Sequence, residues 1–114
     1  MAAYQLDYLE LPSSDAKKSR GFFQSAFGWS FADFGGTYAE IRDAGLLFGV
    51  NADPEDRSSA PIAVIRTDDL EKAERDVVKA GGVITRPAYD FPGGRRFYFR
   101  EPGGAELAVY VTTG

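Results

Sequence analysis

The chain has 114 residues, a formal net charge of −4, and neither cysteine nor histidine. This length is typical of one globular domain that needs no disulfides, and the acidic balance argues against nucleic acid as a partner. The missing residue types exclude thiol chemistry, the usual general base and the commonest ligand of first-row metals. No signal peptide and no apolar run of membrane-spanning length is visible, so we expect a cytoplasmic protein without a membrane partner.

The first half of the sequence predicts one helix among four strands. Residues 4–11 form a short apolar segment that Pro12 ends, which is typical of a strand. Residues 13–15 offer helix N-caps, and apolar side chains then recur at spacings of three and four up to Phe27. Gly28 is placed as the left-handed residue that ends this helix. Glycine-containing turns separate three further expected strands, at 29–34, 37–42 and 46–50.

The second half predicts the same order of elements after a polar linker at 51–60. Residues 61–66 predict a strand, residues 67–69 offer the cap of the next helix, and Asp68 and Glu71 have capping-box spacing. Gly81 and Gly82 end that helix. The remaining segments are expected to be strands at 83–85, 95–100 and 105–111, with a loop at 88–94.

The two halves are related by a nearly constant offset, which indicates one structural unit used twice. Asp15 and Asp69, Ala26 and Ala80, and Gly28 and Gly82 are each 54 residues apart. The offset grows to 60 between Leu47 and Leu107, so we infer a loop insertion in the second unit. Units that cannot bury their apolar faces alone must pack together, and we expect the site where they meet.

Several motifs in this repeat resemble the glyoxalase/bleomycin-resistance/extradiol-dioxygenase superfamily, also called vicinal oxygen chelate. They are residues 9–12 followed by Asp15, and the segments 27–29, 69–73, 81–83 and 99–104. The resemblance covers nearly the whole chain and implies a single α+β domain of two β-α-β-β-β modules, at 4–50 and 61–112. It also implies a curved mixed sheet or open barrel, a cup between the modules that holds a small molecule, and a homodimer.

Catalytic members of that superfamily hold a divalent metal through side chains on the first and last strand of each module. The corresponding positions here are predicted to be Tyr8, Phe48, Ile62 and Ala108, with Gly49 in place of Phe48 if the register shifts by one. None of these is a usual ligand, so we expect no metal and no other cofactor. In this respect the chain is similar to the metal-free members, such as the bleomycin-binding resistance proteins.

We therefore predict metal-independent binding or sequestration of a small, partly aromatic organic molecule. Strand alternation, together with the aromatic and arginine content of the second half, selects the expected ligand-binding residues. They are Tyr8, Phe48, Ile62, Val64, Arg96, Tyr98, Ala108 and Tyr110. For any one of the aromatic residues, packing in the core is the competing interpretation, above all for Trp29.

Two other functions stay open at this point. A glyoxalase-type lyase or isomerase would use Glu10 or Glu106 as a general base, or an unusual oxygen site that borrows Glu10, Glu40 or Glu106 for a hard cation. A solvated position or a salt bridge is the simpler interpretation of these glutamates. The third function is a regulatory interaction module that binds no ligand.

Overall fold

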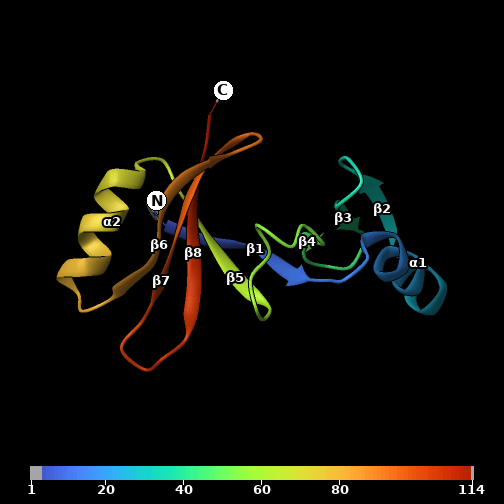
Figure 1. The fold of residues 1–114 in the computed structure, drawn as a ribbon, viewed down its shortest axis with the longest axis horizontal. Coiled ribbons are helices and arrows are strands. Elements are labelled where there is room, and N and C mark those ends of the chain that lie inside the picture. Colours follow the sequence, from blue (N-terminus) through green and yellow to red (C-terminus); the bar gives the residue numbers. More distant parts are fainter. Residues whose placement is uncertain (1–3, 114) are drawn as a thin grey trace. The chain divides into compact units, whose positions relative to one another are not determined.

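The computed structural model describes residues 4–113. Eight strands and two helices follow one another there in the predicted order, β-α-β-β-β twice (Figure 1). The elements are β1 (Tyr4–Pro12), α1 (Ala16–Phe27), β2 (Ser30–Asp33), β3 (Tyr38–Arg42), β4 (Phe48–Asn51), β5 (Ile62–Thr67), α2 (Leu70–Lys79), β6 (Val83–Phe91), β7 (Gly94–Arg100) and β8 (Glu106–Thr112). The α+β class is confirmed. The chain divides into two compact units, here called the N-terminal unit (residues 8–62) and the C-terminal unit (residues 4–7 and 63–113).

The N-terminal unit is a four-stranded sheet in the order β2-β3-β4-β1, with α1 against one face. β1 and β4 run parallel, and the other neighbours are antiparallel. Asp15 caps α1 by accepting the backbone N–H groups of Lys17 and Lys18, and Gly28 ends the helix at φ 74°, so both helix boundaries are confirmed. The core lies under α1, where Ile41, Phe48 and Val50 pack against partly buried side chains that include Trp29.

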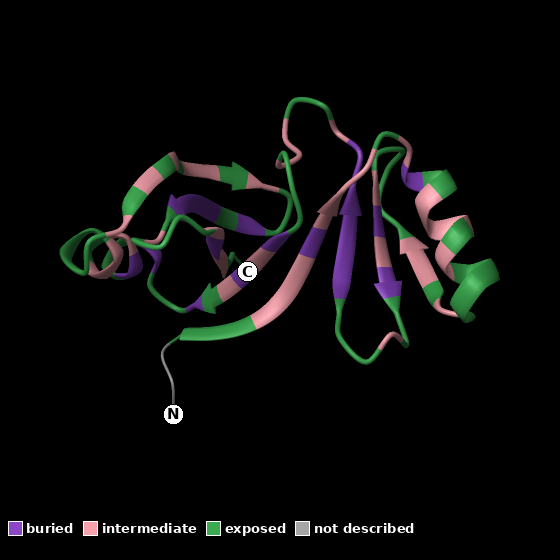
Figure 2. Cartoon of the chain, turned by 90° about the horizontal axis from the view of Figure 1, so that it is seen from below, coloured by how far each residue is buried: buried purple, intermediate pink, exposed green. Residues whose placement is uncertain are grey.

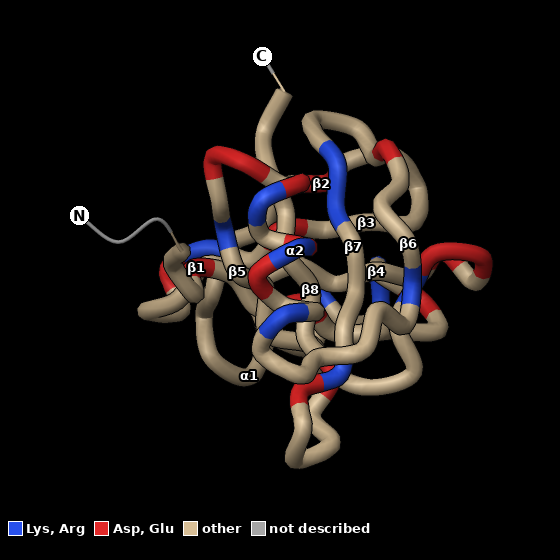
Figure 3. Tube along the Cα trace, turned by 90° about the vertical axis from the view of Figure 1, so that its left-hand side faces the viewer, with Lys and Arg blue, Asp and Glu red and all other residues tan. Residues whose placement is uncertain are grey.

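The C-terminal unit repeats this arrangement with the strand order β5-β8-β7-β6 and the helix α2. β5 and β8 are parallel, whereas β8, β7 and β6 are antiparallel neighbours. Its core is formed by Leu70, Ala73, Phe97, Phe99 and Val109. Acidic and basic residues are interspersed along α2 (Figure 3), and Lys72 and Asp76 form an ion pair of 2.8 Å. Figure 2 shows that burial in both units is concentrated on strands, while the helices stay largely exposed.

Two local predictions in the second half are corrected. Among the predicted caps at 67–69, Asp69 is the N-cap of α2, because its carboxylate accepts the backbone N–H of Lys72, so the capping-box spacing of Asp68 and Glu71 does not mark the helix start. The predicted loop at 88–94 is mostly strand: β6 continues to Phe91, which pairs with Gly94 across a tight turn. Two register shifts in the β6–β7 pairing accommodate Pro87, whose missing N–H would interrupt a regular ladder.

Neither helix in residues 4–113 combines the length and the hydropathy that a membrane span requires.

Candidate functional site

The sheet of the N-terminal unit has one face under α1 and an opposite face that carries polar side chains. Leu9, Ile41, Phe48 and Val50 lie on the helix side. Because side chains alternate along a strand, their neighbours Tyr8, Glu10, Tyr38, Gly49 and Asn51 belong to the opposite face. Four of these residues, Tyr8, Glu10, Tyr38 and Asn51, form what we call the phenol–carboxylate cluster.

Hydrogen bonds connect the members of the phenol–carboxylate cluster in a chain. The hydroxyl groups of Tyr8 and Tyr38 are 2.5 Å apart, and the Tyr38 hydroxyl donates to Oε2 of Glu10 at 3.2 Å. The amide nitrogen of Asn51 donates to the other oxygen, Oε1, at 3.1 Å. Glu10 is only 2% exposed, so these donors replace the water that a carboxylate would otherwise need.

Asn51 connects this cluster to the segment that follows β4. Its amide nitrogen also donates to Oδ2 of Asp56 at 2.8 Å, and its carbonyl oxygen accepts the backbone N–H of Asp53 at 2.9 Å. One side-chain amide therefore separates two carboxylates and satisfies an oxygen of each. This explains how two acidic groups are accommodated so close together in a partly buried place.

Tyr38 keeps its proton over the whole physiological pH range. Burial, and next the negative charge of Glu10, raise the pKa of the Tyr38 phenol well above its ordinary value. A phenol that stays protonated serves as a permanent donor to Glu10. Because Tyr38 has a single hydroxyl proton and donates it to Glu10, the hydrogen bond between the two phenols is donated by Tyr8.

Gly49 makes room for the phenol–carboxylate cluster, and it corrects one predicted position. β1 and β4 pair Leu9 with Phe48 and Glu10 with Gly49, so the register is shifted by one from the 60-residue offset. The expectation that Phe48 lies on the face of Tyr8 is wrong, because Phe48 packs under α1 against Phe23 and Trp29. A Cβ atom at position 49 would lie 1.8 Å from the Tyr38 hydroxyl oxygen and 2.2 Å from that of Tyr8.

The C-terminal unit carries a second polar group, which we call the arginine–tyrosine cluster: Arg86, Tyr89, Arg96 and Tyr98. The two tyrosine rings are parallel within 6°, with centroids 6.5 Å apart. The Arg86 guanidinium lies 4.1 Å from the Tyr89 ring centroid, and that of Arg96 lies 5.4 Å from the Tyr98 centroid. Nε of Arg96 donates to the Tyr89 hydroxyl at 2.6 Å. These are cation–π distances, and such contacts offset part of the water that a buried guanidinium loses.

The other predicted residues of the C-terminal unit lie around this cluster. Ala108 pairs with Tyr98 on one side and with Val64 on the other, and all three are buried. The Tyr110 hydroxyl donates to both carboxylate oxygens of Asp7 at 3.2 Å, and burial and that carboxylate raise the pKa of Tyr110. Oε2 of Glu106 accepts the Thr85 hydroxyl at 2.6 Å.

Sequence reasoning missed four members of the two clusters. Tyr38 stands two residues from Glu40 and Asn51 two residues from Gly49, so alternation finds both once Gly49, and not Phe48, is placed on this face. Arg86 and Tyr89 carried no such signal, because the loop predicted across residue 89 concealed the strand that holds them. The remaining predicted ligand-binding residue, Ile62 of the N-terminal unit, is buried at the start of β5.

The side chains at the superfamily's metal positions do not fit a divalent metal. With the corrected register these positions are Tyr8, Gly49, Ile62 and Ala108, and three of them have no oxygen, nitrogen or sulfur in the side chain. Both oxygens of the adjacent Glu10 already accept hydrogen bonds, and no three His, Cys, Asp or Glu side chains are grouped as ligands in residues 4–113. We therefore derive no chemistry through a metal.

The comparison with known families agrees with this architecture. A family model described as the Glyoxalase/Bleomycin resistance protein/Dioxygenase superfamily matches residues 5–109. The chain belongs to this superfamily. No curated protein sequence matches the chain significantly.

Solved structures show the same fold at low sequence identity. A Legionella pneumophila protein described as NAD-dependent benzaldehyde dehydrogenase has a TM-score of 0.79 at 13% identity, covering 93% of this chain and 98% of its own. Methylmalonyl-CoA epimerase from Mycobacterium tuberculosis has a TM-score of 0.72 at 13% identity, with coverages of 100% and 94%. The Mn(II)-bound glyoxalase from Novosphingobium aromaticivorans has a TM-score of 0.61 at 16% identity, and the match covers 91% of this chain and 37% of that one.

Proposed function

We propose that this superfamily member binds a small, partly aromatic organic molecule without a resident divalent metal, as a sequestering protein does. The observation that carries the proposal is the residue composition of the strand faces opposite the helices. The metal positions hold phenolic, glycine and aliphatic residues, while phenols, guanidinium groups and an amide stand around them.

Each cluster offers interactions that suit a flat organic ligand. The ring of Tyr89 and the planar guanidinium of Arg86, both partly exposed, offer stacking surfaces, and the buried Arg96 and Tyr98 support them from beneath. In the other unit, Tyr38 and Asn51 hold a buried carboxylate in one place, which keeps the polar groups around it oriented before a ligand arrives. Preformed polar groups in otherwise apolar surroundings are typical of small-molecule sites.

The direct test is a thermal-shift screen of aromatic acids, amines and heterocycles, followed by calorimetric titration of the compounds that stabilise the protein. A ligand that binds the folded state raises the unfolding temperature by mass action. We expect stabilising compounds to bind with the same affinity in EDTA and in buffer supplemented with Mn²⁺, Ni²⁺, Zn²⁺ or Mg²⁺. Stoichiometric metal in the purified protein, together with binding that EDTA abolishes, would refute the metal-independent proposal.

Adjacent arginines on β7 provide a matched pair of variants. Arg96 is buried in the arginine–tyrosine cluster, whereas Arg95 is exposed and pairs with Asp90 at 2.8 Å. Arg96→Lys keeps the charge but loses the planar fork, so we expect it to weaken the selected ligand about tenfold or more. Arg95→Lys is expected to leave the affinity unchanged. Equal effects of the two substitutions would exclude the arginine–tyrosine cluster from the binding site.

A further inference from the structure

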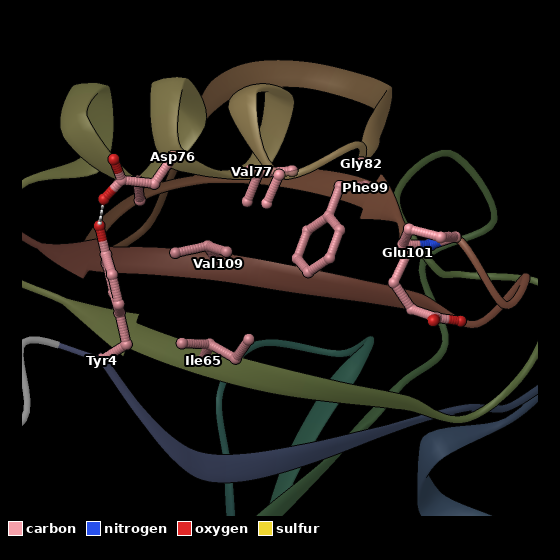
Figure 4. A pocket seen from close by; sticks show the side chains of 11 residues that line it. Tyr4, Ile65, Asp76, Val77, Gly82, Phe99, Glu101 and Val109 are labelled. Atoms are coloured by element: carbon pink, nitrogen blue, oxygen red, sulfur yellow. Dashed lines mark hydrogen bonds between the residues drawn. The ribbon is translucent and has the colours of Figure 1, made fainter.

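The C-terminal unit contains a pocket on the helix side of its sheet, on the face opposite the arginine–tyrosine cluster (Figure 4). Its volume is about 280 Å³. Ala73 and Val77 of α2, with its C-cap residue Ala80, form one wall, and Ile65, Phe99 and Val109 of β5, β7 and β8 form the other. The walls are therefore almost wholly apolar, with one aromatic ring among aliphatic groups.

Small residues keep this space open. Ala73 and Ala80 present only methyl groups from the helix, and Gly82 follows the helix with no side chain. A Cβ atom at position 82 would lie 2.6 Å from Cγ1 of Val77, so any side chain there would displace Val77 where β6 begins beneath the helix. An apolar space of this size forfeits dispersion contacts that a closely packed core would make, and an apolar ligand restores them.

The polar groups at the two ends of the pocket already have partners within the protein. At one end the Tyr4 hydroxyl donates to Oδ2 of Asp76 at 2.5 Å, and Nζ of Lys72 donates to the same oxygen at 2.8 Å (Figure 4). At the other end, the Glu101 carboxylate accepts the backbone N–H groups of Gly103 and Ala105 at 2.8 and 2.6 Å. A ligand thus needs no polar group, and a carboxylate at each end disfavours an anion.

We propose that this pocket binds a small uncharged compound of one or two rings, of the size of toluene or indole. An engineered apolar cavity of about 150 Å³ in another protein accepts benzene, so the larger space here suits one substituted ring or two fused rings. Apolar walls select the ring system, and the satisfied end groups give no advantage to a charged derivative. This second site is distinct from the strand face to which the proposed function belongs.

Neighbouring residues on the same strands allow the two sites to be distinguished. Ile65 and Val109 line the pocket, whereas Val64 and Ala108, one position away on β5 and β8, lie on the opposite face. The methyl resonances of these four residues, recorded by NMR during a titration with indole, report which face is occupied. We expect saturable shifts of Ile65 and Val109, together with Val77, and much smaller shifts of Val64 and Ala108.

Substitutions at the C-terminal end of α2 provide the matched control. Ala80 is exposed at the pocket, so Ala80→Phe fills it from the rim without disturbing the buried wall, whereas Val78 is 55% exposed and does not line the pocket. We expect Ala80→Phe to weaken indole binding at least tenfold and Val78→Phe to leave it unchanged, with benzoate shifting no pocket methyl group.

Three results would overturn this proposal: no saturable shift of the pocket methyl groups up to the solubility of indole, shifts confined to Val64 and Ala108, or equal binding by the two variants. The wild-type titration is decisive by itself if Ala80→Phe does not fold. The outcome does not depend on whether the strand face binds its own ligand.

Discussion

Replacing Gly49 by alanine is expected to disrupt the phenol–carboxylate cluster. The backbone at this position does not require glycine, since Gly49 lies in a strand and has no positive φ. The added Cβ atom would instead meet the Tyr38 hydroxyl oxygen at 1.8 Å. Since ordinary contact begins at 3.4 Å, that oxygen has to retreat by about 1.6 Å, and its bonds to Tyr8 and Glu10 are lost.

The cost follows from the bonds that break. A hydrogen bond to a charged group contributes about 1.5–3 kcal/mol and a neutral one about 0.5–1.5 kcal/mol, while Gly→Ala stabilises by about 0.4–1 kcal/mol through the unfolded chain. The net loss is about 1–4 kcal/mol. With an unfolding entropy of about 2.1 cal/mol/K per residue, a loss of about 2.5 kcal/mol lowers the Tm by about 10 °C.

Urea unfolding of a double-mutant cycle with Tyr38→Leu measures this effect. Tyr38→Leu removes two of the three close contacts of the added Cβ, those with the Tyr38 hydroxyl and ring carbon, and leaves the Tyr8 hydroxyl, so Gly49→Ala should cost at least about 1 kcal/mol less in that background. Gly36→Ala is the control, because Gly36 is exposed with open space around it and has no positive φ. The reasoning is refuted if Gly49→Ala costs the same in both backgrounds within about 0.5 kcal/mol.

Three further predictions concern other parts of the protein. The backbone N–H groups of Ala105 and Gly103 hold the pKa of Glu101 below its usual value, so its stabilisation is present above the unfolded pKa and lost as the pH falls. The difference in urea stability between wild type and Glu101→Gln should therefore shrink between about pH 7 and about pH 3, and a constant difference would contradict it. Gly82→Ala should lower the free energy of unfolding by about 1–3 kcal/mol, because its Cβ meets Val77, and the same substitution should cost less in a Val77→Ala background, where the side-chain contact is gone. The raised pKa of Tyr38 predicts that this phenol ionises only when the protein unfolds at alkaline pH. In an alkaline titration, wild type and Tyr38→Phe should therefore give the same phenolate absorbance as long as both are folded, and a larger absorbance of folded wild type would contradict the prediction.

Much of the fold could be predicted because its signals are local. Asp15 and Gly28 bound α1 through hydrogen bonding and backbone conformation that involve only nearby residues. The length of β6 was missed because proline and glycine between 87 and 94 imitate a loop, and only pairing with β7 shows that the strand continues through register shifts.

The sequence by itself determined the superfamily and the duplicated β-α-β-β-β order, since residue types and short-range spacing decide both. The tertiary structure decided which residues share a face. A shift of one residue in a parallel pair exchanges Phe48 for Gly49, and that exchange gives two phenols their place beside a buried carboxylate. Such register depends on the packing of α1 against the opposite face of the sheet, which short-range spacing does not encode.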